Sequence, residues 1–477
     1  MGAVASRFDK RMLDLVFGDD SIGDTPDTRA ASSSRLFVRS QVQIAFASAN
    51  AKGRLLSSHE ALQTFGWEVL LIVATEGSAP LVRSADEPAN TLRSQRIELG
   101  LSTGDVAKRA GLTEEEVAQA EVPGTLTPIR TLDVLGQTLA LDERRLGYQP
   151  DAGRDSALGV RLRELRQAVD VAVFGPTTVL DLSEAAWVIS RQAYLAKALG
   201  FKSRKRVEIP GPNASYGHPA YKIGYSLAEQ TRRLLGLNGE EPVGSLRSLI
   251  EEVLEIPLVQ QTLHSRFAGA TIANGSTRGI VVNERGSNSN VWVRRMTMCH
   301  ELGHLLWDPD TYLEQLKVDE YSGLDGNALD PKRDVVEIRA NAFAVAFLAP
   351  RDGVLAVMDD CKGVAQKTVS EVMSRYGISA TAAKHHVQNI ANVDTSSVRV
   401  SALPTPTDDW MAQEELSISY FPIKTTPVSR RGKFAWFVAK LVSGGKLSED
   451  TAAAYLKCEK HEISAHLATI LDMWAEE

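Results

Sequence analysis

Two patterns of apolar and polar residues occur along this chain, and they predict two kinds of element. From residue 90 onward, most apolar positions recur every three or four residues, as in amphipathic helices, and Ser, Thr or Gly stands at the ends of these runs. Between residues 257 and 283 the pattern changes to short apolar runs, which are typical of strands. The chain is therefore expected to be an α+β protein that is mainly helical. We expect helices over residues 92–99, 103–110, 114–120, 131–140, 157–169, 182–199, 226–235, 245–255, 291–307, 334–348, 432–442, 448–457 and 463–474, a helix–turn–helix over 364–390, and strands over 257–260, 266–273 and 279–283.

Five segments follow from shifts in this pattern. The pattern in residues 1–90 says the least about structure or function. An apolar run at 67–74 fits a buried strand or a helix, and we assign the segment no role. Further segments are a helix–turn–helix domain (91–148), a helical connector with a basic loop (149–217), an α+β domain with a helix–turn–helix-like end (218–392) and a C-terminal helical segment (393–477). The basic run in the loop (Lys202, Arg204, Lys205, Arg206) can contact phosphates, but such runs are more typical of solvated linkers.

Composition narrows the class of protein. The apolar share is 43% and the charged share 24%, as in ordinary globular proteins, which excludes a disordered or collagen-like chain. A net charge of −7 excludes a global basic field for nucleic acid. The longest apolar run, residues 69–74, is far shorter than a membrane helix, and three scattered cysteines fit a reducing compartment. We therefore expect a cytoplasmic protein with no membrane partner.

The strongest chemical signal is the motif His300-Glu301-Leu302-Gly303-His304. On a helix, residues four apart lie on one face, so two imidazoles at this spacing can bind one zinc ion. Zinc lowers the pKa of a bound water to about 7, and the intervening glutamate can accept the proton of that water. The motif thus predicts a zinc site with Glu301 as the general base of a hydrolase.

A catalytic zinc needs a third protein ligand and an open fourth position. Glu337 is the best candidate, because Asn341 and Ala344 share its helical face and small residues there allow a close approach; Asp334, one turn earlier, is the second choice. Asp308 or Asp310 can orient a histidine, although solvated positions at a helix exit are equally typical. Cys299 is expected to be a packed small hydrophobe rather than a ligand, and His385 and His386 are expected to be structural.

Three ordered blocks carry a family resemblance. FAGATIANGSTRGIVVNER, RRMTMCHELGHLLW and EIRANAFAVAFLAP resemble the ImmA/IrrE family of zinc metallopeptidases over about residues 220–350, and the helical tail to about 392 is also similar. The resemblance implies a compact zincin-like core with a small sheet, His300, His304 and Glu337 as zinc ligands, and Glu301 as general base. It also implies cleavage of a repressor under stress. The family's usual Leu-Met-Pro ending is Leu348-Ala349-Pro350 here.

A second resemblance lies near residue 100. LRSQRIELGLSTGDVAKRAGLTEEEVAQAE resembles the XRE (lambda-repressor-like) helix–turn–helix family. In that fold the recognition helix presents its first residues to base edges, and here those residues are Glu114, Glu115 and Glu116. Residues 92–147 hold seven basic and nine acidic side chains, although Arg93, Arg96, Lys108 and Arg109 can form a small basic rim. We therefore expect weak DNA binding and a role in protein docking or autoinhibition.

Two main functions remain open from the sequence. The first is a zinc-dependent regulatory endopeptidase whose protein substrate is an XRE-type transcriptional repressor, acting in a stress, phage or mobile-element response. The second is a DNA-binding XRE-type regulator whose metal domain is a sensor; a non-catalytic interaction module is a third. Glu301 favours the enzyme, because a structural zinc site needs no carboxylate beside its ligands. The oligomeric state is left open, a dimer included.

Overall fold

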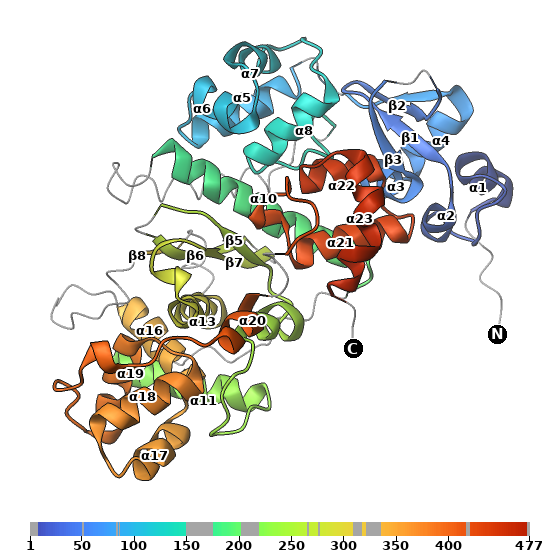
Figure 1. Cartoon of the computed structure of the whole chain (residues 1–477). Helices are drawn as coiled ribbons and strands as arrows, with labels where there is room; N and C mark the ends of the chain where they lie inside the picture. The colour runs from blue at the N-terminus through green and yellow to red at the C-terminus, as the bar shows by residue number, and fades with distance from the viewer. Residues whose placement is uncertain are drawn as a thin grey trace. The chain divides into compact units, whose positions relative to one another are not determined.

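The chain divides into two compact units, each described here by itself. The computed structural model describes residues 8–49, 52–82, 84, 86–148, 175–201, 219–264, 267–274, 277–308, 317–320, 335–415 and 420–474. Unit 1 comprises residues 1–202 and 417–477, and unit 2 comprises residues 203–416 (Figure 1). Both units combine helices with one small sheet, so the fold is α+β and mainly helical, as the sequence predicted.

Unit 1 contains a four-stranded antiparallel sheet that the sequence pattern did not reveal. Its strand order is β3-β1-β2-β4. The run at 67–74, for which a strand and a helix were both open, is helical. The elements are α1 (Lys10–Phe17), α2 (Pro26–Ser32), β1 (Leu36–Arg39), β2 (Gln43–Phe46), β3 (Arg54–Ser57), α3 (Ser58–Phe65), α4 (Trp67–Glu76), β4 (Ser78–Pro80), α5 (Ala89–Glu98), α6 (Thr103–Ala110), α7 (Glu114–Ala120), α8 (Ile129–Thr138), α10 (Pro176–Ala198), η4 (Val428–Arg430), α21 (Lys433–Ser443), α22 (Glu449–Leu456) and α23 (Lys460–Asp472).

Buried ion pairs join distant parts of the sequence within unit 1. Arg54 of β3 pairs with Asp133 of α8 at 2.6 Å, and Arg430 pairs with Glu184 of α10 at 3.2 Å. A buried charge without its partner is strongly destabilising, so these pairs favour the one packing of the segments in which both charges are paired. The segments 1–90, 91–148 and the helices after residue 420, which the sequence suggested as separate, therefore pack as one unit.

Unit 2 is built around a mixed sheet with strand order β5-β7-β6-β8. Strands β5 and β7 are parallel, while β6 is antiparallel to both of its neighbours. The elements are α11 (Ala220–Leu234), α12 (Leu246–Ser248), the π-helix η1 (Leu249–Val253), β5 (Leu258–Gln261), β6 (Phe267–Asn274), β7 (Thr277–Asn283), η2 (Gly286–Ser289), α13 (Val291–Trp307), β8 (Lys317–Glu320), α16 (Val335–Leu348), α17 (Arg351–Asp360), α18 (Ala365–Tyr376), α19 (Ala380–Ala391), η3 (Val400–Ala402) and α20 (Asp408–Glu415).

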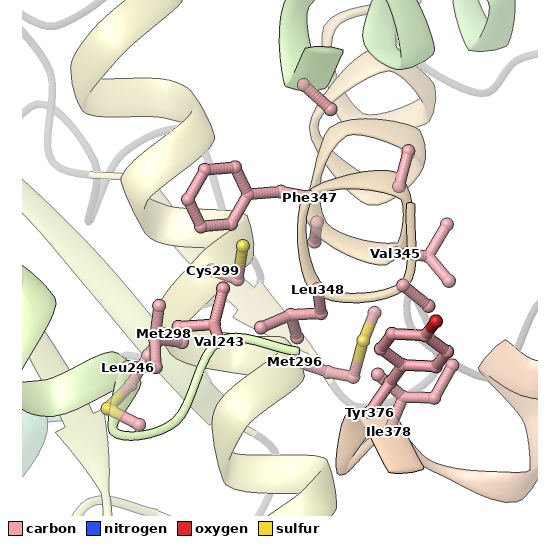
Figure 2. Packing of buried hydrophobic residues seen from close by; sticks show 14 of the residues in the cluster. Val243, Leu246, Met296, Met298, Cys299, Val345, Phe347, Leu348, Tyr376 and Ile378 are labelled. Carbon is pink, nitrogen blue, oxygen red and sulfur yellow. The ribbon is translucent and has the colours of Figure 1, made fainter. Parts of the chain in front are cut away.

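The central helix of unit 2 is α13, which packs against β6 and β7 on one side and against α16 on another. Asn290 caps it, because its side-chain oxygen accepts a hydrogen bond from the Trp292 N–H at 2.9 Å. Figure 2 shows side chains of the core between α13 and α16, among them Cys299 and Phe347, both fully buried. Cys299 therefore packs as a small hydrophobe, as expected, and burial raises the pKa of its thiol.

Gly303 allows α16 to approach α13 closely. A Cβ at this position would lie 2.8 Å from Cδ1 of Phe343, whose buried ring stacks on Phe347 and has little room to move. The close approach matters for the site described below, because α16 and α13 both contribute side chains to it.

We expect Gly303→Ala to destabilise unit 2 by about 1–3 kcal/mol, since overpacking a filled core typically costs that much. Thermal unfolding followed by circular dichroism checks this. Gly104→Ala in α6 is the matched control: it adds only ordinary contacts, the nearest at 3.5 Å, and should stabilise by about 0.5–1 kcal/mol through helix propensity. A Gly303→Ala protein as stable as the wild type would contradict this account of the packing.

The structure adds elements that the sequence pattern missed. Strand β8 lies where a loop was expected, and α17 and α20 were not predicted. The helix expected over 245–255 is a single turn followed by a π-helix. The predicted helix at 157–169 and the basic run from Lys202 lie outside the described residues. Within the described part of the chain, no single helix is both long and apolar enough to cross a membrane, although α16 and α17, bent by 58°, reach that length and composition together.

Candidate metal centre

Helix α13 places His300 and His304 side by side on its buried face. The two Nε2 atoms lie 2.9 Å apart, and both imidazoles are almost fully buried. The spacing of four residues produces this juxtaposition, because one helical turn separates the two side chains. The Nε2 atoms of both imidazoles thus face one position.

Helix α16 brings Glu337 to the same point. One carboxylate oxygen lies 3.2 Å from Nε2 of His300 and the other 3.5 Å from Nε2 of His304. All three ligand atoms lie within 4.8 Å of one another. Ligands about 2.0–2.1 Å from a tetrahedral ion would be about 3.3 Å apart, so these residues suit a divalent metal such as zinc. The donor set leaves a fourth position for water or substrate.

Each histidine is oriented by a hydrogen bond from its other ring nitrogen. His300 Nδ1 lies 2.9 Å from the side-chain oxygen of Asn341, and His304 Nδ1 lies 2.8 Å from a carboxylate oxygen of Asp308. Because both partners accept, Nδ1 carries a proton in each ring, so Nε2 is the nitrogen that a metal can bind. Asp308 also forms an ion pair with Arg339 of α16, which fixes the carboxylate.

Glu301 is fully buried, and its carboxylate contacts strand β6 of the sheet. The Thr271 hydroxyl of β6 donates a hydrogen bond to one of its carboxylate oxygens. Gly269, also on β6, lies close to the carboxylate: a Cβ there would lie 3.2 Å from Oε1 of Glu301 and 2.9 Å from Cγ2 of Thr297, so glycine allows this close approach. The strand therefore packs closely against the glutamate and holds it in one orientation.

The electrostatics of the centre favour a charged pair in the absence of metal. Burial alone would lower the pKa of His304, but hydrogen bonds to Asp308 and Glu337 outweigh it and raise that pKa to about 9. Burial alone would raise the pKa of Glu337, but hydrogen bonds from His300 and His304 hold it well below its usual range. Without metal, these interactions favour the protonated form of His304 opposite the Glu337 carboxylate.

Metal binding should therefore release a proton, and zinc affinity should rise with pH. A metal binds neutral imidazole, so the proton on His304 competes with the ion below a pH of about 9. We expect the apparent affinity to increase about tenfold per pH unit between pH 7 and about 9 and then to level off. Chelator-competition titrations across this range measure it.

Asp308→Asn is the control for this pH dependence. It removes the charge that holds the proton on His304, so the plateau should be reached at a lower pH. An affinity that does not change between pH 7 and 8.5 in the wild type would contradict the assignment of the proton.

Of the four residues singled out from the sequence, the structure brings His300, His304 and Glu337 together, while the Glu301 carboxylate contacts Thr271 of β6. Of the two acids proposed to orient a histidine, Asp308 does so, while Asp310 and the rival ligand Asp334 lie outside the described residues. The sequence placed Asn341 on the same helical face as Glu337 but did not predict its contact with His300. No sequence signal indicated the contact of Thr271 with Glu301. His386 is structural: its Nε2 lies 2.7 Å from the Ala349 carbonyl oxygen.

A comparison with family models identifies the type of domain. Residues 248–388 match the IrrE N-terminal-like domain of the peptidase M78 family. The match runs from α12 into α19 and so includes both helices of the metal centre. It indicates a peptidase domain of the IrrE/ImmA type, in agreement with the resemblance drawn from the sequence. It does not extend to the predicted XRE-like domain. No curated protein matches the chain.

Proposed function

We propose that this chain is a zinc-dependent regulatory endopeptidase that cleaves a transcriptional repressor of the XRE type in a stress, phage or mobile-element response. The observation that carries the peptidase proposal is the convergence of two imidazole nitrogens and a carboxylate beside Glu301 within an IrrE-like domain. The donor set supports zinc, which favours nitrogen and oxygen ligands in this arrangement.

The side chains divide the chemistry among them. Zinc, when bound, acidifies water and polarises a peptide carbonyl. His300, His304 and Glu337 hold the ion, and Asn341 and Asp308 keep the two imidazoles in the ligating tautomer. Glu301 accepts a proton from the attacking water and delivers it to the departing amine. The hydroxyl of Thr271 fixes the Glu301 carboxylate during both transfers.

The substrate proposal is tested with candidate repressors. The zinc-loaded full-length protein is incubated with each purified product of the neighbouring genes, and mass spectrometry locates any cleavage. We expect one XRE-type repressor to be cut at a single site and to stay intact when the chelated protein is used. If all neighbouring products stay intact while a denatured general substrate is cut, the repressor proposal fails and the peptidase proposal stands.

The helix–turn–helix of unit 1 is proposed to dock protein rather than DNA. Helices α6 and α7 meet at Gly111, whose left-handed φ of +68° makes the turn. Two of the four cations that could form its basic rim are engaged inside the unit: Arg96 pairs with Glu121 at 2.6 Å, and Arg109 pairs with Asp181 and Glu184, both at 2.7 Å. The three glutamates that begin α7 are exposed.

We therefore expect the full-length protein to bind its own upstream DNA no more tightly than random DNA of equal length. At physiological salt, the dissociation constant should lie in the non-specific range of about 10⁻⁴–10⁻⁶ M. Fluorescence anisotropy with labelled duplexes measures the affinities for the upstream DNA and for the random DNA. Sequence-specific binding near 10⁻⁸ M, as in dedicated regulators, would favour the alternative function, a DNA-binding regulator whose metal domain is a sensor.

A further inference from the structure

Unit 2 contains a cavity of about 540 Å³ whose described lining includes neither the candidate metal ligands nor Glu301. It lies among α11, α13, α16, α18, α19 and residues 400–405. Cavities of about 300–1,000 Å³ are typical of small-molecule sites. The volume exceeds that of any single amino-acid side chain, so one residue of a peptide would leave much of it empty.

The wall of this cavity is mainly apolar. Trp292, Val293, Met296, Ile338 and Val345 form its apolar part. Among the lining residues in the described part of the chain there is no Asp, Glu, Lys or Arg. A charged ligand entering it would lose its hydration without meeting a counter-charge, which is costly.

Two of the polar groups in the wall, on Tyr225 and His386, are fixed by a hydrogen bond to each other. His386 Nε2 donates to the Ala349 carbonyl oxygen at 2.7 Å, so its Nδ1 accepts from the Tyr225 hydroxyl at 3.0 Å. Burial lowers the pKa of His386 to about 4, which keeps the ring neutral. Tyr221 and Asn389 add hydrogen-bonding groups to the same wall.

The cavity is distinct from the metal centre but adjoins it. His300, His304, Glu337 and Glu301 are not among its described lining residues. Asn341 is, and its side-chain oxygen also lies 2.9 Å from Nδ1 of His300. One side chain therefore separates the contents of the cavity from a candidate metal ligand.

We propose that this cavity binds a neutral small molecule that has an aromatic or aliphatic body and a hydrogen-bonding edge. The apolar wall accommodates the body, and the tyrosine and asparagine side chains meet the edge. The absence of Asp, Glu, Lys and Arg among the described lining residues disfavours phosphates, carboxylates and ammonium compounds; of the two lining histidines, His386 is buried and His385 is exposed. This proposal does not depend on the peptidase activity.

A pair of fluorescent probes with the same aromatic body tests the charge selection. N-phenyl-1-naphthylamine is neutral and carries one N–H group, while 8-anilinonaphthalene-1-sulfonate adds a negative charge. Titrated into the metal-free full-length protein, the neutral probe should bind at one site per chain, and the anionic probe at least about tenfold more weakly.

Substitutions that fill the cavity locate the probe. Ala382→Trp on α19 and Val293→Trp on α13 enter from different walls, so one can be read if the other fails to fold. Each should weaken binding of the neutral probe at least about tenfold. Ala391→Trp, on the same helix as Ala382 but outside the lining, should leave binding unchanged. Folded cavity-filling variants that bind the neutral probe like the wild type, or equal affinity for both probes, would overturn the proposal.

Discussion

Glu301→Gln is expected to abolish peptide cleavage while leaving the fold and the metal in place. The substitution preserves the shape of the side chain but removes the group that accepts and returns a proton. The loss in kcat/KM should be about 10²–10⁴-fold, the usual contribution of a general base. Because the carboxylate does not lie among the three candidate ligands, zinc content should stay at one per chain.

The assay compares wild type and Glu301→Gln on the same repressor, with zinc content measured on the same samples. Glu252→Gln is the matched control, because it makes the same chemical change at an exposed position of η1 in unit 2. It should cleave as the wild type does. A Glu301→Gln protein that retains full activity would show that another group moves the proton.

Removing one of the three ligands is expected to remove stoichiometric zinc. His304→Ala and Glu337→Ala each leave two protein donors, and a site with three ligands has none to spare. The loss in affinity should exceed the roughly 10–100-fold that loss of an orienting partner costs. Inductively coupled plasma mass spectrometry after dialysis, followed by chelator competition, provides the measurement.

Two kinds of control accompany the ligand variants. Asn341→Ala removes only the acceptor for His300, so zinc should bind about 10–100-fold more weakly but remain stoichiometric at high concentration. His385→Ala removes an exposed histidine of α19 and should have no effect. Stoichiometric zinc retained by both His304→Ala and Glu337→Ala would refute this metal centre.

The site was predictable to the extent that its geometry is local. His300 and His304 meet because they are one turn apart on one helix, and the same is true of His304 and Asp308. The pairing of Glu337 with them depended on a guess that small residues let a second helix approach; Gly303, against which Phe343 packs, is the residue that permits it. Thr271 contacts Glu301 across thirty residues, which no periodicity encodes.

The predictable parts of the fold were likewise those that depend on local interactions. Most helices after residue 90 were found because capping residues and apolar periodicity act over a few residues, although α17 and α20 were missed. The sheet of unit 1 was not, since its strands are only three or four residues long and residues 36–80 alternate too briefly to show a period. Strand β8 is equally short and pairs with β6, about fifty residues earlier.

The sequence by itself determined the helical character of most of the chain, the small central sheet of unit 2, and the four residues on which the metal and proton chemistry is proposed to depend. Only the tertiary structure decided which residues orient them, that the segments before residue 149 and after residue 420 belong to one unit, and that a cavity lies behind Asn341. The physical reason is that caps, periodicity and i,i+4 pairs are local interactions. Buried ion pairs such as Arg430 with Glu184, and the walls of a cavity, instead join residues far apart in sequence whose proximity depends on the packing of the whole unit.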